Sequence, residues 1–136
     1  MDAQDKCKPG PVGNVGHCMS GRYVTSVAAR YPTRFAASAS LYGVGIVTEE
    51  EDSPHLSVDQ IQGEILYIFA ETDRSVPDHV VPDLSAALKK AGTNSTVEVF
   101  PGTEHGFMFS QRLPYHPQGA EEAWTKLFDL WDRNLK

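Results

Sequence analysis

The chain has few cysteines, no long apolar run and fewer basic than acidic residues. Its two cysteines, Cys7 and Cys18, give no sign of a disulfide scaffold, so we expect a reducing, cytoplasmic compartment. No apolar run approaches the roughly 18 residues of a membrane span, and the polar start, residues 1–6, does not resemble a signal peptide. The net charge of −6 argues against nucleic acid and anionic membranes as partners.

The composition is that of a small globular domain, with 40% hydrophobic and 22% charged residues. Candidate strands alternate with candidate helices, which predicts an α/β fold with a parallel sheet and flanking helices. Residues 1–11 are expected to form a polar arm before one domain over 12–136. We predict strands over 12–17, 35–42, 64–70 and 96–100, helices over 20–31, 78–91 and 119–135, and a long connection over 43–62.

The most informative motif is Gly16-His17-Cys18-Met19-Ser20-Gly21. It resembles a nucleophile elbow, Gly-x-nucleophile-x-Gly, except that Ser20 takes the place of the downstream glycine and Gly21 follows it. The nucleophile of such a turn has a strained backbone, and bulk two residues to either side would collide with the adjoining strand and helix. The motif therefore predicts a reactive Cys18 between a strand and a helix.

An acid and a histidine follow in order, each just after a predicted strand. Asp73 comes after the apolar run 65–70, which lacks alternation as a buried parallel strand does, and His105 comes after the strand 96–100. In an open α/β sheet, sites form at the edge where the carboxyl ends of the strands meet. The order nucleophile, acid, base is also the one that α/β-hydrolases use.

These motifs resemble those of the dienelactone hydrolase family of α/β-hydrolases. The resemblance implies a three-layer α/β/α fold and a catalytic triad of Cys18 as nucleophile, His105 as base and Asp73 as the residue that orients it. It implies a hydrolase of small esters or lactones that forms a thioester, with the Met19 N–H as an oxyanion donor and no cofactor. Candidates for binding a substrate carboxylate are Arg22, Arg74 and Arg112, together with Tyr115. The resemblance rests on residues 16–21, Ala70-Glu71-Thr72-Asp73, Val76-Pro77, Glu104-His105-Gly106-Phe107, Arg112, Tyr115 and 120–124.

The resemblance covers only the C-terminal half of the expected domain. We therefore expect a truncated α/β-hydrolase fold, without the N-terminal strands or the loop that supplies the second oxyanion N–H. Strand 12–17, which is central in the complete fold, would become an exposed edge, and we predict that it pairs with a second copy in a homodimer. Two alternatives remain: a catalytically impaired remnant that acts as a dimeric scaffold or binding protein, and the C-terminal part of a longer protein.

Each candidate residue also has a structural alternative. Cys18 could be a buried apolar side chain, Asp73 could start a turn or cap a helix, and His105 could be a turn residue. Surface charge accounts better than substrate binding for Arg22 and Arg112, and packing accounts equally well for Tyr115. Four histidines lack the spacing of a metal site and are expected to be structural, so no metal is predicted: His17, His55, His79 and His116.

Overall fold

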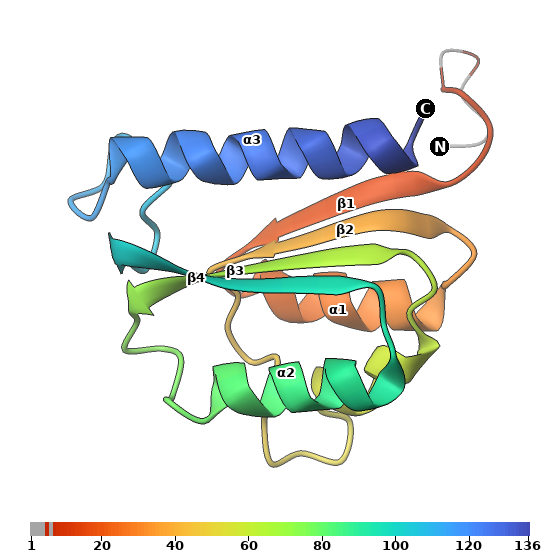
Figure 1. Ribbon diagram of the computed structural model, residues 1–136, viewed down its shortest axis with the longest axis horizontal. Helices are drawn as coiled ribbons and strands as arrows, with labels where there is room; N and C mark the ends of the chain where they lie inside the picture. Colours follow the sequence, from red (N-terminus) through yellow and green to blue (C-terminus); the bar gives the residue numbers. More distant parts are fainter. Residues whose placement is uncertain (1–4, 6) are drawn as a thin grey trace.

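Alternating strands and helices give the chain three layers. The computed structural model describes residue 5 and residues 7–136, and positions 7–11 of the predicted arm are exposed. The sheet is parallel, in the order β1-β2-β3-β4, with α3 on one face and α1 and α2 on the other (Figure 1). This confirms the predicted α/β fold. The elements are β1 (Val12–His17), α1 (Ser20–Arg30), β2 (Phe35–Leu41), the 3-10 helix η1 (Pro54–Gln60), β3 (Glu64–Thr72), α2 (Val80–Ala91), β4 (Ser95–Glu104) and α3 (Pro117–Asn134).

Strand β3 organises the core because both of its faces are covered. All of its residues from Ile65 to Ala70 are buried, as the lack of alternation predicts for an inner parallel strand. One apolar cluster joins β3 to α3, and a second joins it to α1 and α2. Members of the first include Leu41, Ile68, Leu127 and Leu130, and members of the second include Ile65, Phe69, Leu84 and Leu88.

The predicted boundaries agree closely except at β4. We predicted a strand that ends at Phe100, before Pro101 and Gly102, residue types that usually interrupt strands. The strand instead continues to Glu104, since a shift of register after Ala70 lets β3 and β4 pair again beyond this point. The predicted connection over 43–62 also contains η1. No helix of the described residues is long and apolar enough to cross a membrane.

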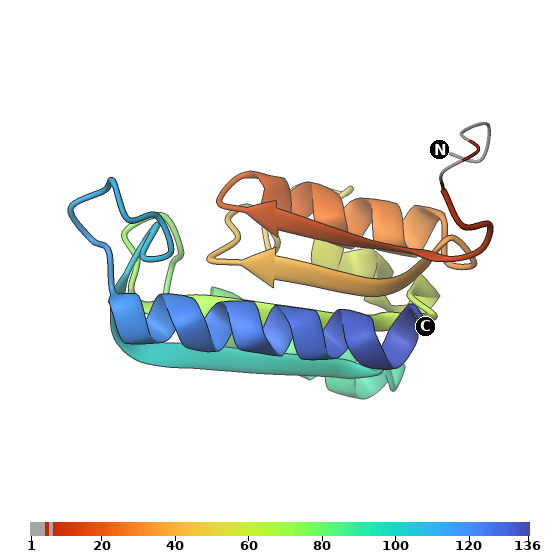
Figure 2. The ribbon, with the colours of Figure 1, turned by 90° about the horizontal axis from the view of Figure 1, so that it is seen from above.

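Strand β1 forms one edge of the sheet and β4 the other (Figure 2). A helix lies against each face of β1. A Cβ atom on Gly13 would lie 2.7 Å from Trp131 Nε1 in α3, and one on Gly16 would lie 2.7 Å from Val24 Cγ2 in α1. The outer backbone N–H and C=O groups of β1 have no partner strand among the described residues. Pairing of this edge with a second copy stays a prediction.

Candidate active site

Cys18 lies on a sharp turn between β1 and α1 with a backbone that few residues adopt. Its φ angle is +57°, in the left-handed region that disfavours side chains with a Cβ atom. Three hydrogen bonds hold this conformation: the Cys18 N–H donates to the Leu41 carbonyl at 3.1 Å, and the Cys18 carbonyl accepts from the N–H groups of Gly21 at 3.0 Å and Val44 at 3.1 Å. The strained backbone predicted for the elbow is therefore present.

The glycines beside this turn have steric causes. A Cβ atom on Gly16 would lie 2.5 Å from the Ser20 carbonyl oxygen, closer than any real side chain tolerates. One on Gly21 would lie 2.5 Å from the Cα of Gly43, beyond the end of β2. Ser20 itself is exposed, which explains why a serine can replace the glycine of the usual motif at this position.

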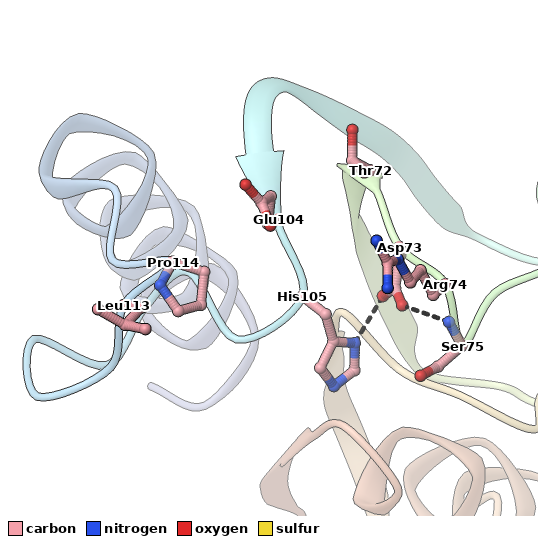
Figure 3. Close-up of a pocket in the computed structure, with 8 residues that line it drawn as sticks. All are labelled: Thr72, Asp73, Arg74, Ser75, Glu104, His105, Leu113 and Pro114. Carbon is pink, nitrogen blue, oxygen red and sulfur yellow. Dashed lines mark hydrogen bonds and ion pairs between the residues drawn. The ribbon is translucent and has the colours of Figure 1, made fainter.

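Asp73 and His105 form a direct hydrogen bond at the ends of neighbouring strands (Figure 3). The His105 Nδ1 and Asp73 Oδ2 atoms lie 2.6 Å apart, and the Asp73 side chain is 2% exposed against 24% for His105. The second carboxylate oxygen, Oδ1, accepts the Ser75 N–H at 2.9 Å. With Nδ1 held by the acid, the ring presents Nε2 on its opposite side, the orientation that a general base requires.

Contacts between β3 and β4 fix the spacing of this pair. The Glu71 carboxylate accepts the Gly102 N–H at 2.9 Å, and the Glu71 N–H donates to Thr103 Oγ1 at 3.4 Å. One position further along, Thr72 and Glu104 are direct partners in the sheet. Asp73 directly follows Thr72 and His105 directly follows Glu104, so the pairing of the two strands brings the acid and the histidine together.

Tyr42 connects this pair to the cysteine turn. Its hydroxyl and His17 Nδ1 share a hydrogen bond of 2.7 Å, and its ring centroid lies 5.3 Å from that of His105 in an edge-to-face arrangement. The pKa of the Tyr42 hydroxyl is raised, mainly by burial. The charge of nearby Arg112 opposes this increase, and nearby Cys18 adds to it. Within the described chain no hydrogen bond joins the Cys18 thiol to His105, and apo sites often show such looser geometry.

A cavity of about 710 Å³ lies beside the acid and the histidine. Among the predicted cations, Arg74 contributes to its wall (Figure 3). Leu113 and Pro114 border it from the loop between β4 and α3, so three separate segments line this open space. Its lining residues are Thr72, Asp73, Arg74, Ser75, Glu104, His105, Leu113 and Pro114.

The other predicted substrate-binding residues have different surroundings. The Arg112 guanidinium lies 5.3 Å from the centre of the Phe109 ring. Its charge lowers the pKa of the Tyr42 hydroxyl, so Arg112 lies near the cysteine turn. Arg22 lies 5.9 Å from the ring centre of Tyr23, on the surface of α1. Tyr115 packs against the core cluster beneath α3. Arg74 and Arg112 are thus the cations with contacts at the site.

Three of the remaining histidines, His17, His55 and His116, have hydrogen-bond partners, and His17 belongs to the site. His116 Nδ1 accepts the Gly119 N–H at 2.9 Å and caps α3, and His55 Nδ1 lies 2.7 Å from Ser53 Oγ. Over residue 5 and residues 7–136, no group of three or more His, Cys, Asp or Glu side chains could hold a metal ion. Sequence reasoning missed the pairing of His17 with Tyr42. Its signal was the place of Tyr42 at the carboxyl end of a predicted strand, where sites form.

Comparison with known proteins gives the same result as the motifs. The model of the "Dienelactone hydrolase family" matches residues 1–135. The chain is 34% identical over 132 residues to the "Putative carboxymethylenebutenolidase" of Synechocystis sp., covering 95% of this chain and 53% of that protein. It is also 34% identical over 130 residues to the "Carboxymethylenebutenolidase homolog" of Mus musculus, covering 93% and 50%.

The fold is shared with solved structures as well. The structure named "m3DLH" superposes with a TM-score of 0.83 at 15% identity, covering 99% of this chain and 57% of that one. The chain spans about half the length of the curated relatives it matches. The match over nearly every residue, together with the α/β fold, shows that this chain belongs to the dienelactone hydrolase family.

Proposed function

We propose that the chain is a thiol-dependent hydrolase of small esters or lactones. Cys18 is the nucleophile, His105 the general base and Asp73 the residue that orients the base. The observation that carries the proposal is the 2.6 Å hydrogen bond between Asp73 and His105, which lies beside the cavity. The ring of Tyr42 lies between this pair and the strained turn that carries Cys18. Residue type, chain order and position at the strand ends all agree with this chemistry.

The reaction follows from these roles. His105 Nε2 removes the proton of the Cys18 thiol, and the thiolate attacks the substrate carbonyl to form a tetrahedral oxyanion. Asp73, nearly excluded from water, stabilises the imidazolium that results. The imidazolium returns its proton to the leaving alkoxide as the thioester forms, and water activated by His105 then releases the acid and the thiol.

The Met19 N–H supports the oxyanion in this scheme. It donates no hydrogen bond within the described part of the chain, so it is available to a substrate oxygen. A family hydrolase normally adds a second N–H donor from an earlier loop, which we do not expect from this chain alone. Without that donor we expect turnover to be slower by about 10²–10³-fold.

A substrate that carries a carboxylate suits the cations around the site. Arg74 is part of the cavity wall, and Arg112 acts on the Tyr42 hydroxyl near Cys18. We therefore propose that these two bind the anionic group, and the weaker candidates Arg22 and Tyr115 remain predictions. The two relatives compared above are named for carboxymethylenebutenolidase, a hydrolase.

A second candidate function is a dimeric scaffold or binding protein without catalysis. The observation that favours it is the outer edge of β1, which has no partner strand in the part of the chain that the structure describes and leads directly into the cysteine turn. In the homodimer that we propose, this edge pairs with that of a second copy. The two functions make opposite predictions for the reactivity of the thiol.

The deciding experiment is the pH dependence of alkylation at Cys18, followed by peptide mass spectrometry. Exposed Cys7 is the internal control in the same sample. We expect Cys18 to be alkylated faster than Cys7, because His105 would accept the thiol proton and the start of α1 favours a thiolate. The His105→Ala variant should lose this advantage.

Turnover is measured in parallel with p-nitrophenyl acetate. Cys18→Ala should lower hydrolysis by about 10³-fold or more, the effect of removing a nucleophile from an assembled triad. If Cys18 instead titrates like Cys7 and hydrolysis does not depend on it, the scaffold function is the better account.

A further inference from the structure

Tyr42 occupies an unusual position directly after β2. Its φ angle is +40°, in a region that aromatic residues rarely adopt, yet the side chain is only 1% exposed. Its N–H donates to the Ile68 carbonyl at 2.6 Å, which ties the residue to β3. Strained backbone of this kind persists where the surroundings hold it, and it gathers at functional sites.

The side chain touches both parts of the proposed active site. The hydroxyl shares the 2.7 Å hydrogen bond with His17, the residue that precedes Cys18. The ring meets His105 edge to face at 5.3 Å and Phe107 in the same way at 5.4 Å. Tyr42 therefore lies between the cysteine turn and the loop that carries the base.

We propose that Tyr42 is a positioning residue that sets the distance and orientation between the His105 imidazole and the Cys18 turn. This inference rests on the proposed function, because it names the side chain that makes proton transfer between the two possible. We assign Tyr42 no contact with the substrate.

At the base, Tyr42 supplies a constraint that the acid alone cannot. Asp73 fixes the Nδ1 atom of His105, but the imidazole can still tilt about that one hydrogen bond. The Tyr42 ring and the imidazole pack edge to face, and this contact limits the tilt and so fixes where Nε2 points. A misplacement of about 1 Å can cost about 10²-fold in rate, so the constraint is large enough to measure.

At the turn, Tyr42 acts through His17. The His17 ring packs against Phe109 at 5.3 Å and Trp124 at 6.0 Å, and burial lowers its pKa. The hydroxyl of Tyr42 gives this half-buried ring its polar partner and so fixes the residue next to the nucleophile. Arg112 and Cys18 are the other ionisable groups whose charges change the pKa of the same hydroxyl, and His105 packs against the Tyr42 ring.

The test separates the hydroxyl from the ring with two variants and one matched control. Tyr42→Phe removes the bond to His17 and keeps the ring, whereas Tyr42→Leu removes both. The control is Tyr67→Phe, because Tyr67 is equally buried and its hydroxyl lies 3.1 Å from Thr25 Oγ1, within the apolar cluster under α1 and α2. It loses a buried tyrosine hydroxyl without touching the site.

Three readouts are compared in all variants: the pH profile of Cys18 alkylation, kcat and KM for p-nitrophenyl acetate, and the NMR titration of the His105 ring. We expect kcat to fall about 10-fold in Tyr42→Phe and about 10²-fold in Tyr42→Leu with KM little changed, since the loss is in alignment. Tyr42→Leu should also shift the His105 titration and the alkylation profile. Tyr67→Phe should lower the melting temperature but leave all three readouts at wild-type values.

Two results would overturn the inference. Either both Tyr42 variants keep wild-type kinetics and His105 titration, or the Tyr67 control loses as much activity as they do. Failure of the proposed function is recognised separately, because wild-type Cys18 itself is then unreactive. In that event a shifted His105 titration in Tyr42→Leu alone still supports the positioning role, and an unshifted one rejects it.

Discussion

Single residues set the geometry of the cysteine turn through steric exclusion. Gly16 leaves room for the Ser20 carbonyl, and the exposed side chain of Ser20 takes the position where the motif usually has glycine. The φ angle of +57° at Cys18 is tolerated because three backbone hydrogen bonds hold it. The turn therefore depends on the absence of side-chain atoms at specific points.

Replacing Gly16 by alanine tests this steric argument. The new Cβ atom would lie 2.5 Å from the Ser20 carbonyl oxygen and 2.7 Å from Val24 Cγ2, so β1 and α1 must move apart. We expect a loss of about 1–3 kcal/mol in the free energy of unfolding, measured with urea, and slower alkylation of Cys18. Ser20→Ala, at an exposed position, is the control and should change neither. If Gly16→Ala kept wild-type stability, the turn would have room for the added methyl group, and the steric argument would be wrong.

At the scale of elements, the strands carry the site and the helices hold the strands in place. The extension of β4 to Glu104 puts His105 one residue beyond its pairing with β3, opposite Asp73. Helix α3 is fixed at both ends: the His116 side chain caps its start, and Arg133 and Asn134 bind the Glu64 carboxylate of β3 at its end. The loop between β4 and α3 is thereby held against the cavity.

The ion pair at the end of α3 predicts how stability depends on pH. The hydrogen bond from Arg133, aided by Asn134, lowers the pKa of Glu64 from its ordinary value of 4.5 in spite of burial. A carboxyl group whose folded pKa is lowered stabilises the fold above its unfolded pKa and loses that contribution as the pH falls through the folded pKa. Because Arg133 is half exposed, we expect only about 0.5–1 kcal/mol.

The measurement is the free energy of unfolding between pH 7 and pH 3 for wild type and Glu64→Gln. The variant should be less stable at pH 7, and the difference should shrink as the pH falls below 4.5, the ordinary pKa of Glu64, and through its lowered folded pKa. Asp59→Asn, at an exposed residue, serves as the control. An unchanged gap at pH 3 would mean that the effect of Glu64 does not come from its charge.

At the scale of the whole molecule, a four-stranded sheet ends at β1, the strand that leads to the proposed nucleophile. Helices cover both faces of β1, yet its outer hydrogen-bonding groups have no partner strand in the described chain. Relatives of about twice this length share the matched half. The part of the molecule that bears the proposed nucleophile is therefore also the part that is open to association.

We predict that this edge makes the chain a homodimer at micromolar concentration. Two β1 strands related by a two-fold axis would continue the sheet and satisfy the open groups on both copies. Sedimentation equilibrium should give twice the 15.0 kDa mass of the chain, and the backbone amides of β1 should exchange slowly with solvent. A monomer whose β1 amides exchange quickly would contradict the prediction.

The sequence alone determined the features that depend on neighbours along the chain. The elbow follows from glycine spacing, the inner position of β3 from its unbroken apolar run, and the end of α2 from Gly92, whose φ angle is +69°. Each of these is a local effect of side-chain size, hydrophobicity or backbone freedom, so a short segment of sequence is enough to predict it.

Only the tertiary structure decided the contacts that make the site. The bond between Asp73 and His105 joins residues 32 positions apart, and that between His17 and Tyr42 joins residues 25 apart. Continued pairing carried β4 past Pro101 and Gly102, against their usual effect on strands. Such contacts depend on which strands become neighbours and in what register, a property of the assembled sheet and not of any one segment.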